Sequence, residues 1–272
     1  MNLFHVILLA IIQGVTELFP VSSLGHAILF SSLVGWGTDL KSPTLLPFLV
    51  ALHLGTAVAL GIYFWKDWLG FLKPSAVHPV FKQTNQRVLT YLVVGTVPTA
   101  LVAFVLQKKL EQLFSKPMWV AVFLIANGFL LFVGEFLKRR SKIKTLEKLT
   151  LKESAMIGAC QVLALLPGFS RSGSTLVGGL VMGFTHEAAA YFSFLLATPL
   201  IFIAGAYELP KLFKLNLHTI LIPTIIGGIV AGIFAYLSTY FLLRYMKARE
   251  TSALLPFGVY CIILGVVSLL VH

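Results

Sequence analysis

Charged residues are scarce in this sequence: they make up 11% of the 272 residues, whereas 58% are hydrophobic. With a mean hydropathy of +0.92, the chain falls outside the range of soluble globular proteins, so a membrane protein is expected. Acidic residues are especially few, ten against 21 lysines and arginines. The basic residues lie in short loops between apolar runs, a distribution that indicates membrane topology and argues against a nucleic-acid partner.

Cysteine is nearly absent. Cys160 and Cys261 both lie in apolar stretches and match no disulfide or metal-binding spacing, so we expect them to be small core residues. A secretory signal is also lacking, because MNLFHVILLA has neither a basic start nor a small-residue cleavage site. We therefore expect this stretch to be part of the mature protein.

Long apolar runs, by contrast, are abundant. A helix needs about 20 apolar residues to cross a bilayer. Six runs are long enough, at about 45–65, 88–106, 118–137, 188–208, 219–243 and 253–271. Two further apolar regions, 3–34 and 154–184, are each split by proline and serine into pieces too short to cross singly. The sequence therefore predicts an all-α polytopic membrane protein with six transmembrane helices and two re-entrant helix-loop-helix hairpins.

The order of these segments predicts an internal repeat. One hairpin and three spans in each half give three crossings per half, so the second half would be inverted relative to the first, as in many transport-type folds. We expect a single membrane domain, 1–272, with repeat halves at about 1–140 and 150–272.

The distribution of basic residues predicts an orientation. Four, seven and three lysines and arginines occur in the loops 66–87, 138–153 and 244–252, against one, three and two in the loops 36–44, 107–117 and 209–218. The first set should be cytoplasmic, which puts both termini outside. An excess of lysines and arginines on one side remains even if the two broken regions are counted as full spans, so the basic residues do not distinguish the two architectures. The prediction of re-entrance therefore rests on the helix breaks.

The first break, LFPVSSLGH, follows a carboxylate inside an apolar region. Glu17 lies near the end of the first apolar piece, and Gln13 lies one turn earlier on the same helix face. An ionised carboxylate there costs about 2.5 to 3.5 kcal/mol on insertion scales, so another group must offset that cost. Pro20 ends the helix.

The second break, PGFSRSGST, has the composition of an anion site. Pro167 and Gly168 stop a helix, and the helix that begins near Ser172 points its free N–H groups into the break. Arg171 adds a planar fork that matches phosphate. The candidate substrate-binding residues are Ser22, Ser170, Arg171, Ser172, Gly173, Ser174 and Thr175.

A candidate nucleophile lies in the first break. Ser22 or Ser23 can cap the helix that follows, and Ser23 and His26 share the face of its first turn. A serine is a weak nucleophile without a neighbouring base, so we favour Ser23 with His26 as its base. Two rivals stay open, His26 as a direct nucleophile and a metal-bound water.

Structural explanations compete with these functional ones. Serines in membrane helices often bond only to backbone, and an intramembrane Glu with an Arg can be only a buried ion pair. His53, in the middle of a span, is expected to be a packing or supporting residue, and Glu135, near a span end, is expected to be solvated at the interface. A transporter or flippase of anions or lipid carriers could use the same inverted-repeat site.

Three stretches resemble a known family. QGVTELFPVSSLGH and PGFSRSGST, with FSFLLATP at 192–199, closely resemble the signature regions of the undecaprenyl-diphosphate phosphatase (bacitracin-resistance) family of bacterial membrane proteins. The match covers essentially the whole chain in length, segment order and motif position. It implies a lipid phosphatase of the bacterial inner membrane that acts on undecaprenyl diphosphate and whose active site opens to the periplasmic side. A homodimer is also possible for such a chain.

The resemblance also implies roles for particular residues. A divalent cation, Mg2+ or Ca2+, would be held by Glu17 with Gln13, and catalysis would involve Glu17, Ser23, His26 and Arg171. The first signature appears here in its Gln form, at Gln13. Leu24 departs from the family pattern, in which a threonine is common, so a hydroxyl contact from that position is absent.

Overall fold

The computed structural model describes every residue except 1–2, 34–44, 115, 139–142, 214–216 and 272. Its described residues form helices and connecting turns, with no strand among them. The helices are α1 Leu3–Thr16, α2 Ser23–Leu33, α4 Leu45–Tyr63, α5 Trp65–Gly70, α6 Asn85–Phe114, α7 Pro117–Lys138, α8 Leu151–Gln161, α9 Arg171–Val181, α10 His186–Phe213, α11 Leu217–Ala248 and α12 Leu255–Val271. Short 3-10 turns occur at Leu146–Lys148 and Val162–Leu165.

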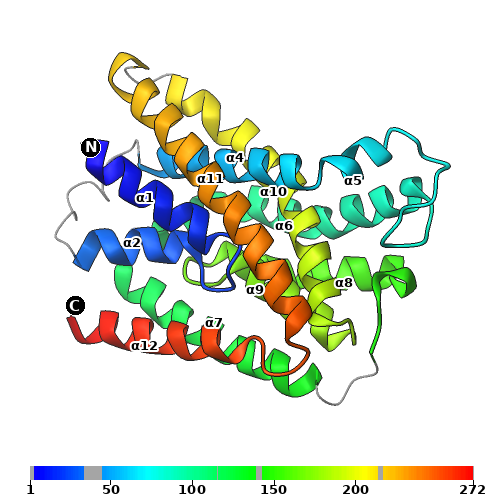
Figure 1. Cartoon of the computed structure of the whole chain (residues 1–272). Helices are drawn as coiled ribbons and strands as arrows, with labels where there is room; N and C mark the ends of the chain where they lie inside the picture. Colours follow the sequence, from blue (N-terminus) through cyan, green and yellow to red (C-terminus); the bar gives the residue numbers. More distant parts are fainter. Residues whose placement is uncertain (1–2, 34–44, 115, 139–142, 214–216, 272) are drawn as a thin grey trace.

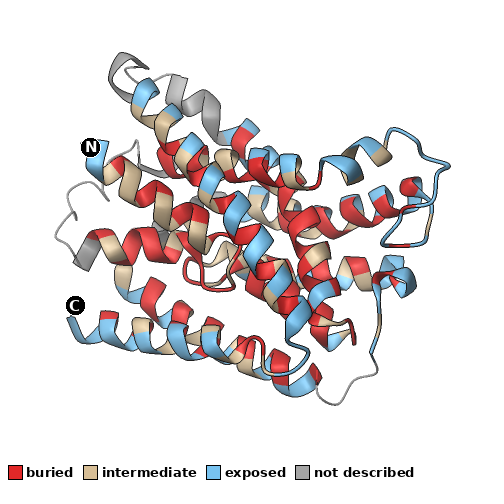
Figure 2. Cartoon of the chain, viewed as in Figure 1, coloured by how far each residue is buried: buried red, intermediate tan, exposed pale blue. Residues whose placement is uncertain are grey.

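The six apolar runs all form helices, as predicted. Four of these helices, α6, α7, α10 and α11, contain segments that are long and apolar enough to cross a membrane. The other two, α4 and α12, are apolar but shorter in their described parts. Many residues along α11 and α12 are exposed (Figure 2), and they include the large apolar residues Ile229, Phe241 and Leu270. The all-helical membrane class is therefore confirmed.

The two broken regions form helical hairpins that turn back inside the molecule. Figure 1 shows α1 and α2 running side by side from one end, and α8 and α9 entering from the other. Their turns meet near the middle. The first hairpin packs through α1 against α11, and the second packs through α8 against α6.

Backbone geometry explains the second turn. Gly168 has a φ of +112°, a conformation that L side chains rarely adopt. It also packs directly on α7, since a Cβ added at Gly168 would lie 2.4 Å from the carbonyl oxygen of Val120. Only glycine satisfies both conditions, so the turn is fixed by this position.

Close backbone contacts hold the long helices together. A Cβ added at Gly55 of α4 would lie 2.0 Å from the carbonyl oxygen of Gly228 on α11, and one at Gly128 of α7 would lie 2.7 Å from that of Gly258 on α12. Small residues at such crossings let membrane helices approach closely, because helix association in lipid depends on packing.

The second hairpin begins at a capping box. Thr150 Oγ1 accepts a hydrogen bond from Glu153 N, and Glu153 Oε2 accepts one from Thr150 N. Burial alone would raise the pKa of Glu153, but Lys144, whose Nζ lies 2.8 Å from Oε1, and the Thr150 bonds hold that pKa below its usual value. The carboxylate therefore stays ionised at neutral pH and keeps the cap in place.

The basic loops gather at one end of the molecule. Figure 1 places the loop after α5, residues 143–150 before α8 and the α11–α12 link at one end, whereas α1 begins and α12 ends at the other. Gln83 Nε2 joins two of these loops by donating to the carbonyl oxygens of Glu147 and Leu149, at 3.0 and 3.2 Å. The prediction for the loop 36–44 lies outside the described residues, as do residues 139–142 of the loop 138–153 and residues 214–216 of the loop 209–218.

One sequence-based expectation was wrong. Glu135 was expected to be solvated near a span end, but it is 1% exposed. Its carboxylate accepts hydrogen bonds from Ser252 N (2.6 Å) and Leu254 N (3.1 Å) and lies 3.0 Å from His186 Nε2. The tertiary structure brings three donors to this carboxylate, so it ties α7, α10 and the α11–α12 link together.

Removing this carboxylate should destabilise the fold. We expect Glu135→Ala to lower the free energy of unfolding by about 3 kcal/mol, because buried donors lose their acceptor. Thermal unfolding in detergent measures the change. Glu187→Ala is the matched control, since the Glu187 side chain is 49% exposed and 3.7 Å from Lys247 at the same end of the molecule. Equal melting temperatures for the two variants would contradict the prediction.

Candidate active site

The two turns are in direct contact. The carbonyl oxygen of Phe19 in the first turn accepts hydrogen bonds from Ser172 Oγ (3.0 Å) and Ser170 Oγ (3.4 Å) of the second. These residues are about 150 positions apart in the chain. The fold therefore brings the two breaks of the sequence together.

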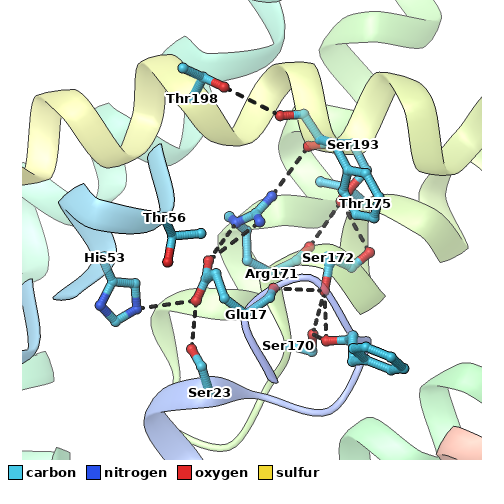
Figure 3. A network of polar contacts seen from close by, with 12 residues as sticks. Glu17, Ser23, His53, Thr56, Ser170, Arg171, Ser172, Thr175, Ser193 and Thr198 are labelled. Carbon is cyan, nitrogen blue, oxygen red and sulfur yellow. Dashed lines mark hydrogen bonds and ion pairs between the residues drawn. The ribbon is translucent and has the colours of Figure 1, made fainter. Parts of the chain in front are cut away.

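A carboxylate and a guanidinium meet where the turns touch (Figure 3). Glu17 comes from the first turn and is 7% exposed. Its Oε1 accepts from Arg171 Nη2 at 3.3 Å and Nε at 3.4 Å, while Arg171 Nη1 donates to the carbonyl oxygen of Ser193 at 3.2 Å. Described residues thus occupy three of the five N–H groups of Arg171 and leave two for a ligand.

The second carboxylate oxygen of Glu17 collects three further groups. Ser23 Oγ donates to Oε2 at 2.6 Å, and Gln13 Nε2 donates to it at 3.1 Å. His53 Nε2 lies 3.2 Å from the same atom. Glu17 is therefore the centre of the polar cluster, and Figure 3 shows Ser23, His53 and Arg171 converging on it from α2, α4 and α9.

His53 is more than a packing residue. Its Nδ1 lies 2.7 Å from the carbonyl oxygen of Leu49, which can only accept, so Nδ1 carries a hydrogen. A hydrogen bond between Nε2 and Glu17 then requires another proton, held by one partner or the other. The expected supporting role of His53 takes the form of a direct contact with the central carboxylate.

The expected pair of Ser23 and His26 is replaced by other contacts. His26 Nδ1 lies 2.7 Å from the carbonyl oxygen of Ser22, and Nε2 lies 2.7 Å from the hydroxyl of Tyr260. Both ring nitrogens are therefore engaged elsewhere, while Ser23 donates to Glu17. Helical spacing placed the two residues near one another, but tertiary partners set where their side chains point.

The serines of the breaks first serve the framework. Ser170 is the N-cap of α9 and accepts from Gly173 N at 3.1 Å, while Ser22 accepts from Gly25 N at 3.2 Å. Such caps satisfy N–H groups that a helix start leaves unpaired. Gly173 packs tightly between the turns, because an added Cβ would lie 3.1 Å from Cβ of Ser170 and 3.3 Å from Cβ of Pro20 in the opposite turn.

Two other predicted binding residues differ in their contacts. Thr175 Oγ1 lies 2.5 Å from Ser193 Oγ and joins α9 to α10. Ser174 Oγ is buried and has no hydrogen-bond partner among the residues that the structure describes. Contacts from these hydroxyls to a phosphate remain predictions.

Three residues near the turns were not singled out from the sequence. Ser193 lies within FSFLLATP, which carried the resemblance but no assigned role, and Tyr260 lies in the last apolar run. Asn127, 0% exposed, bonds to both turns. A lone asparagine inside an apolar run is unusual enough to have drawn attention.

The donor set can accommodate a divalent cation. Gln13 Oε1 is buried and accepts no hydrogen bond from any described residue, and it lies on the side chain that donates to Glu17. Mg2+ and Ca2+ prefer oxygen ligands of this kind. In the described part of the chain, no cluster of three or more His, Cys, Asp or Glu side chains is arranged to bind a metal, so substrate oxygens or water would complete the coordination.

Comparison with known proteins gives a consistent result. The model of the family described as bacitracin resistance protein BacA matches residues 6–267. A relative named undecaprenyl-diphosphatase 2 from Burkholderia ambifaria is 47% identical over 98% of this chain and 95% of its own length. An undecaprenyl-diphosphatase from Acidiphilium cryptum is 46% identical over 97% of this chain and 96% of its own, and an undecaprenyl-diphosphatase 2 from Chromobacterium violaceum is 46% identical over 99% of each.

Proposed function

This chain belongs to the bacitracin resistance protein BacA family, and we propose that the site around Glu17 and Arg171 carries out its reaction. The protein is a membrane phosphatase that hydrolyses undecaprenyl diphosphate to undecaprenyl phosphate and inorganic phosphate. This reaction recycles the lipid carrier for peptidoglycan and cell-envelope synthesis. The observation that carries the choice of site is the buried contact between Arg171 and Glu17, with the Ser23 hydroxyl on the same carboxylate.

Substrate binding follows from charge. The diphosphate is strongly negative, and charge builds further on the leaving phosphate, so catalysis requires positioning and neutralisation. The two remaining N–H groups of Arg171 and the N-terminal end of α9 would hold the diphosphate oxygens. The hydroxyls of Ser170, Ser172 and Thr175 lie in the same turn and would add contacts once substrate displaces their present partners.

Ser23 is the nucleophile that the geometry favours, with Glu17 in place of His26 as the group that takes its proton. Ser23 Oγ would attack the terminal phosphorus, and its proton would pass to Glu17. The bond from that phosphorus to the bridging oxygen breaks, and undecaprenyl phosphate leaves. Water then hydrolyses the phosphoserine, which releases inorganic phosphate and restores the hydroxyl. His26 would hold the first turn in place through the contact of its Nδ1 with the carbonyl oxygen of Ser22.

A cation would be held by Gln13 Oε1 and the Glu17 carboxylate, and when bound it supplies positive charge next to phosphate oxygens. Gln13→Glu should strengthen its binding, because a carboxylate replaces a neutral amide oxygen at the same position. We expect the Mg2+ or Ca2+ concentration for half-maximal effect to fall about tenfold, measured by cation-dependent thermal stabilisation as well as by activity. Unchanged or weaker cation dependence would remove Gln13 from the proposed cation site.

The arrangement in the membrane extends this proposal. We take α1–α2 and α8–α9 as re-entrant hairpins and the other long helices as six spans in an inverted repeat. The matching packing of α1 on α11 and α8 on α6 supports that reading. The gathering of basic loops at one end supports a cytoplasmic location for that end, with both termini and the opening of the site on the periplasmic side of the bacterial inner membrane.

A transporter of anions or lipid carriers is the competing function, because inverted repeats with broken helices also build carriers. Purified protein in detergent distinguishes the two. Release of phosphate from undecaprenyl diphosphate supports the phosphatase, whereas no release combined with substrate-dependent flux in vesicles would support the carrier. The same preparation, analysed by light scattering, would show whether a homodimer forms.

A further inference from the structure

The two turns come from hairpins that are distant in the chain, and one buried amide joins them. Asn127 of α7 donates from Nδ2 to the carbonyl oxygen of Pro20 at 3.0 Å and accepts at Oδ1 from Ser170 N at 3.0 Å. A single side chain of α7 thus holds one backbone group of each turn.

The orientation of this amide is fixed by its partners. A carbonyl oxygen can only accept and a backbone N–H can only donate, so Nδ2 must face Pro20 and Oδ1 must face Ser170. Aspartate could not donate to Pro20, and leucine could bond to neither turn. Cys261 Sγ also approaches the Pro20 carbonyl, but at 3.9 Å it is a weaker partner.

The backbone around this amide is closely packed. The next residue, Gly128, packs on the backbone of Gly258 in α12, and about two helix turns earlier Val120 packs against Gly168 of the second turn. Around the amide itself there is little room, because a Cβ added at Gly173 would lie 3.3 Å from Asn127 Oδ1. Movement of either turn relative to α7 is therefore restricted at this point.

The bonded groups are close to the reacting ones. Pro20 lies midway in sequence between Glu17 and Ser23, and Ser170 directly precedes Arg171. Direct bonds between the turns run mainly to the Phe19 carbonyl, and the contacts from Arg171 to the Glu17 carboxylate are long, at 3.3 and 3.4 Å. These long contacts alone would not fix the positions of the two turns relative to each other.

We infer that Asn127 is a positioning residue. It holds the two turns, and with them Glu17 and Arg171, in the relative positions that phosphoryl transfer requires. This inference rests on the proposed function. Asn127 lies behind the turns and acts through the backbone of both, so it should affect the reacting geometry more than substrate affinity. A misplacement of about 1 Å can cost a hundredfold in rate.

The experiment compares Asn127→Leu and Asn127→Asp with Ser154→Ala. The control removes another buried polar group on a helix interface, since Ser154 Oγ bonds the Tyr91 carbonyl and joins α8 to α6. We expect kcat for undecaprenyl diphosphate to fall about 100-fold in Asn127→Leu, with KM changed less than threefold. Asn127→Asp, which is nearly the same size, should fall at least tenfold. Ser154→Ala should lower the melting temperature by a similar amount and keep its kcat within twofold.

A second measurement follows the bridge itself. Hydrogen exchange of the peptide that contains Ser170 should be faster in Asn127→Leu than in the wild type, because that N–H loses its acceptor, and unchanged in Ser154→Ala. Any one of three results would overturn the inference. They are a kcat of Asn127→Leu within twofold of wild type, a rise in its KM in place of the fall in kcat, and a loss of kcat in Ser154→Ala as large as in the Asn127 variants. If the wild type releases no phosphate, the proposed function fails, while the exchange rates still decide whether the bridge exists.

Discussion

Arg171→Ala is expected to lower kcat for phosphate release at least 1,000-fold. The guanidinium is the only cation that the second turn brings to the site, and loss of one group that stabilises developing charge in a buried site commonly costs two to three orders of magnitude. The substitution also removes the arginine counterion of the buried Glu17 carboxylate, which should add to the loss. Arg171→Lys keeps the charge but not the fork and should lose 10- to 100-fold.

Phosphate release by purified variants in detergent measures these losses, with Glu17→Ala expected to be as inactive as Arg171→Ala. The matched control is Arg244→Ala, since Arg244 is exposed and bonds the hydroxyl of Tyr240 on α11. Its activity should stay within twofold of wild type. A folded Arg171→Ala protein that keeps a tenth of the wild-type kcat would show that the reaction takes place elsewhere.

Ser23→Ala is expected to abolish activity to the same extent and to remove a covalent intermediate. With substrate labelled in its terminal phosphate and rapid quenching, the wild type should yield an acid-stable phosphoenzyme with the label on Ser23. His26→Ala should retain labelling and lose only about tenfold in kcat, because the His26 ring contacts the Ser22 carbonyl and Tyr260 rather than Ser23. Ser31→Ala, in the same helix and also buried, is the control and should keep its label and rate.

The possible outcomes separate the three attack mechanisms. An acid-labile phosphoenzyme that disappears in His26→Ala would identify the histidine as nucleophile. The absence of any phosphoenzyme under rapid quench, with full activity in Ser23→Ala, would favour attack by water. Either result would contradict the assignment of Ser23.

Much of the architecture could be predicted from local sequence. The spans follow from apolar runs because a bilayer sets the length of helix it can hold, and the two turns follow from Pro20, Pro167 and Gly168 because backbone constraints act within a few residues. The set of polar residues at the breaks was also evident, since unpaired polar groups in a membrane require partners or a function.

What the sequence by itself determined is the class of the protein, the position of both breaks and the presence of a carboxylate, a guanidinium and a serine within them. Only the tertiary structure decided the pairing: Ser23 with Glu17 in place of His26, His53 beside the same carboxylate, and Asn127 between the turns. The physical reason is that helix periodicity and chain breaks are local properties, whereas hydrogen-bond partners depend on which segments, often more than 100 residues apart, are packed together.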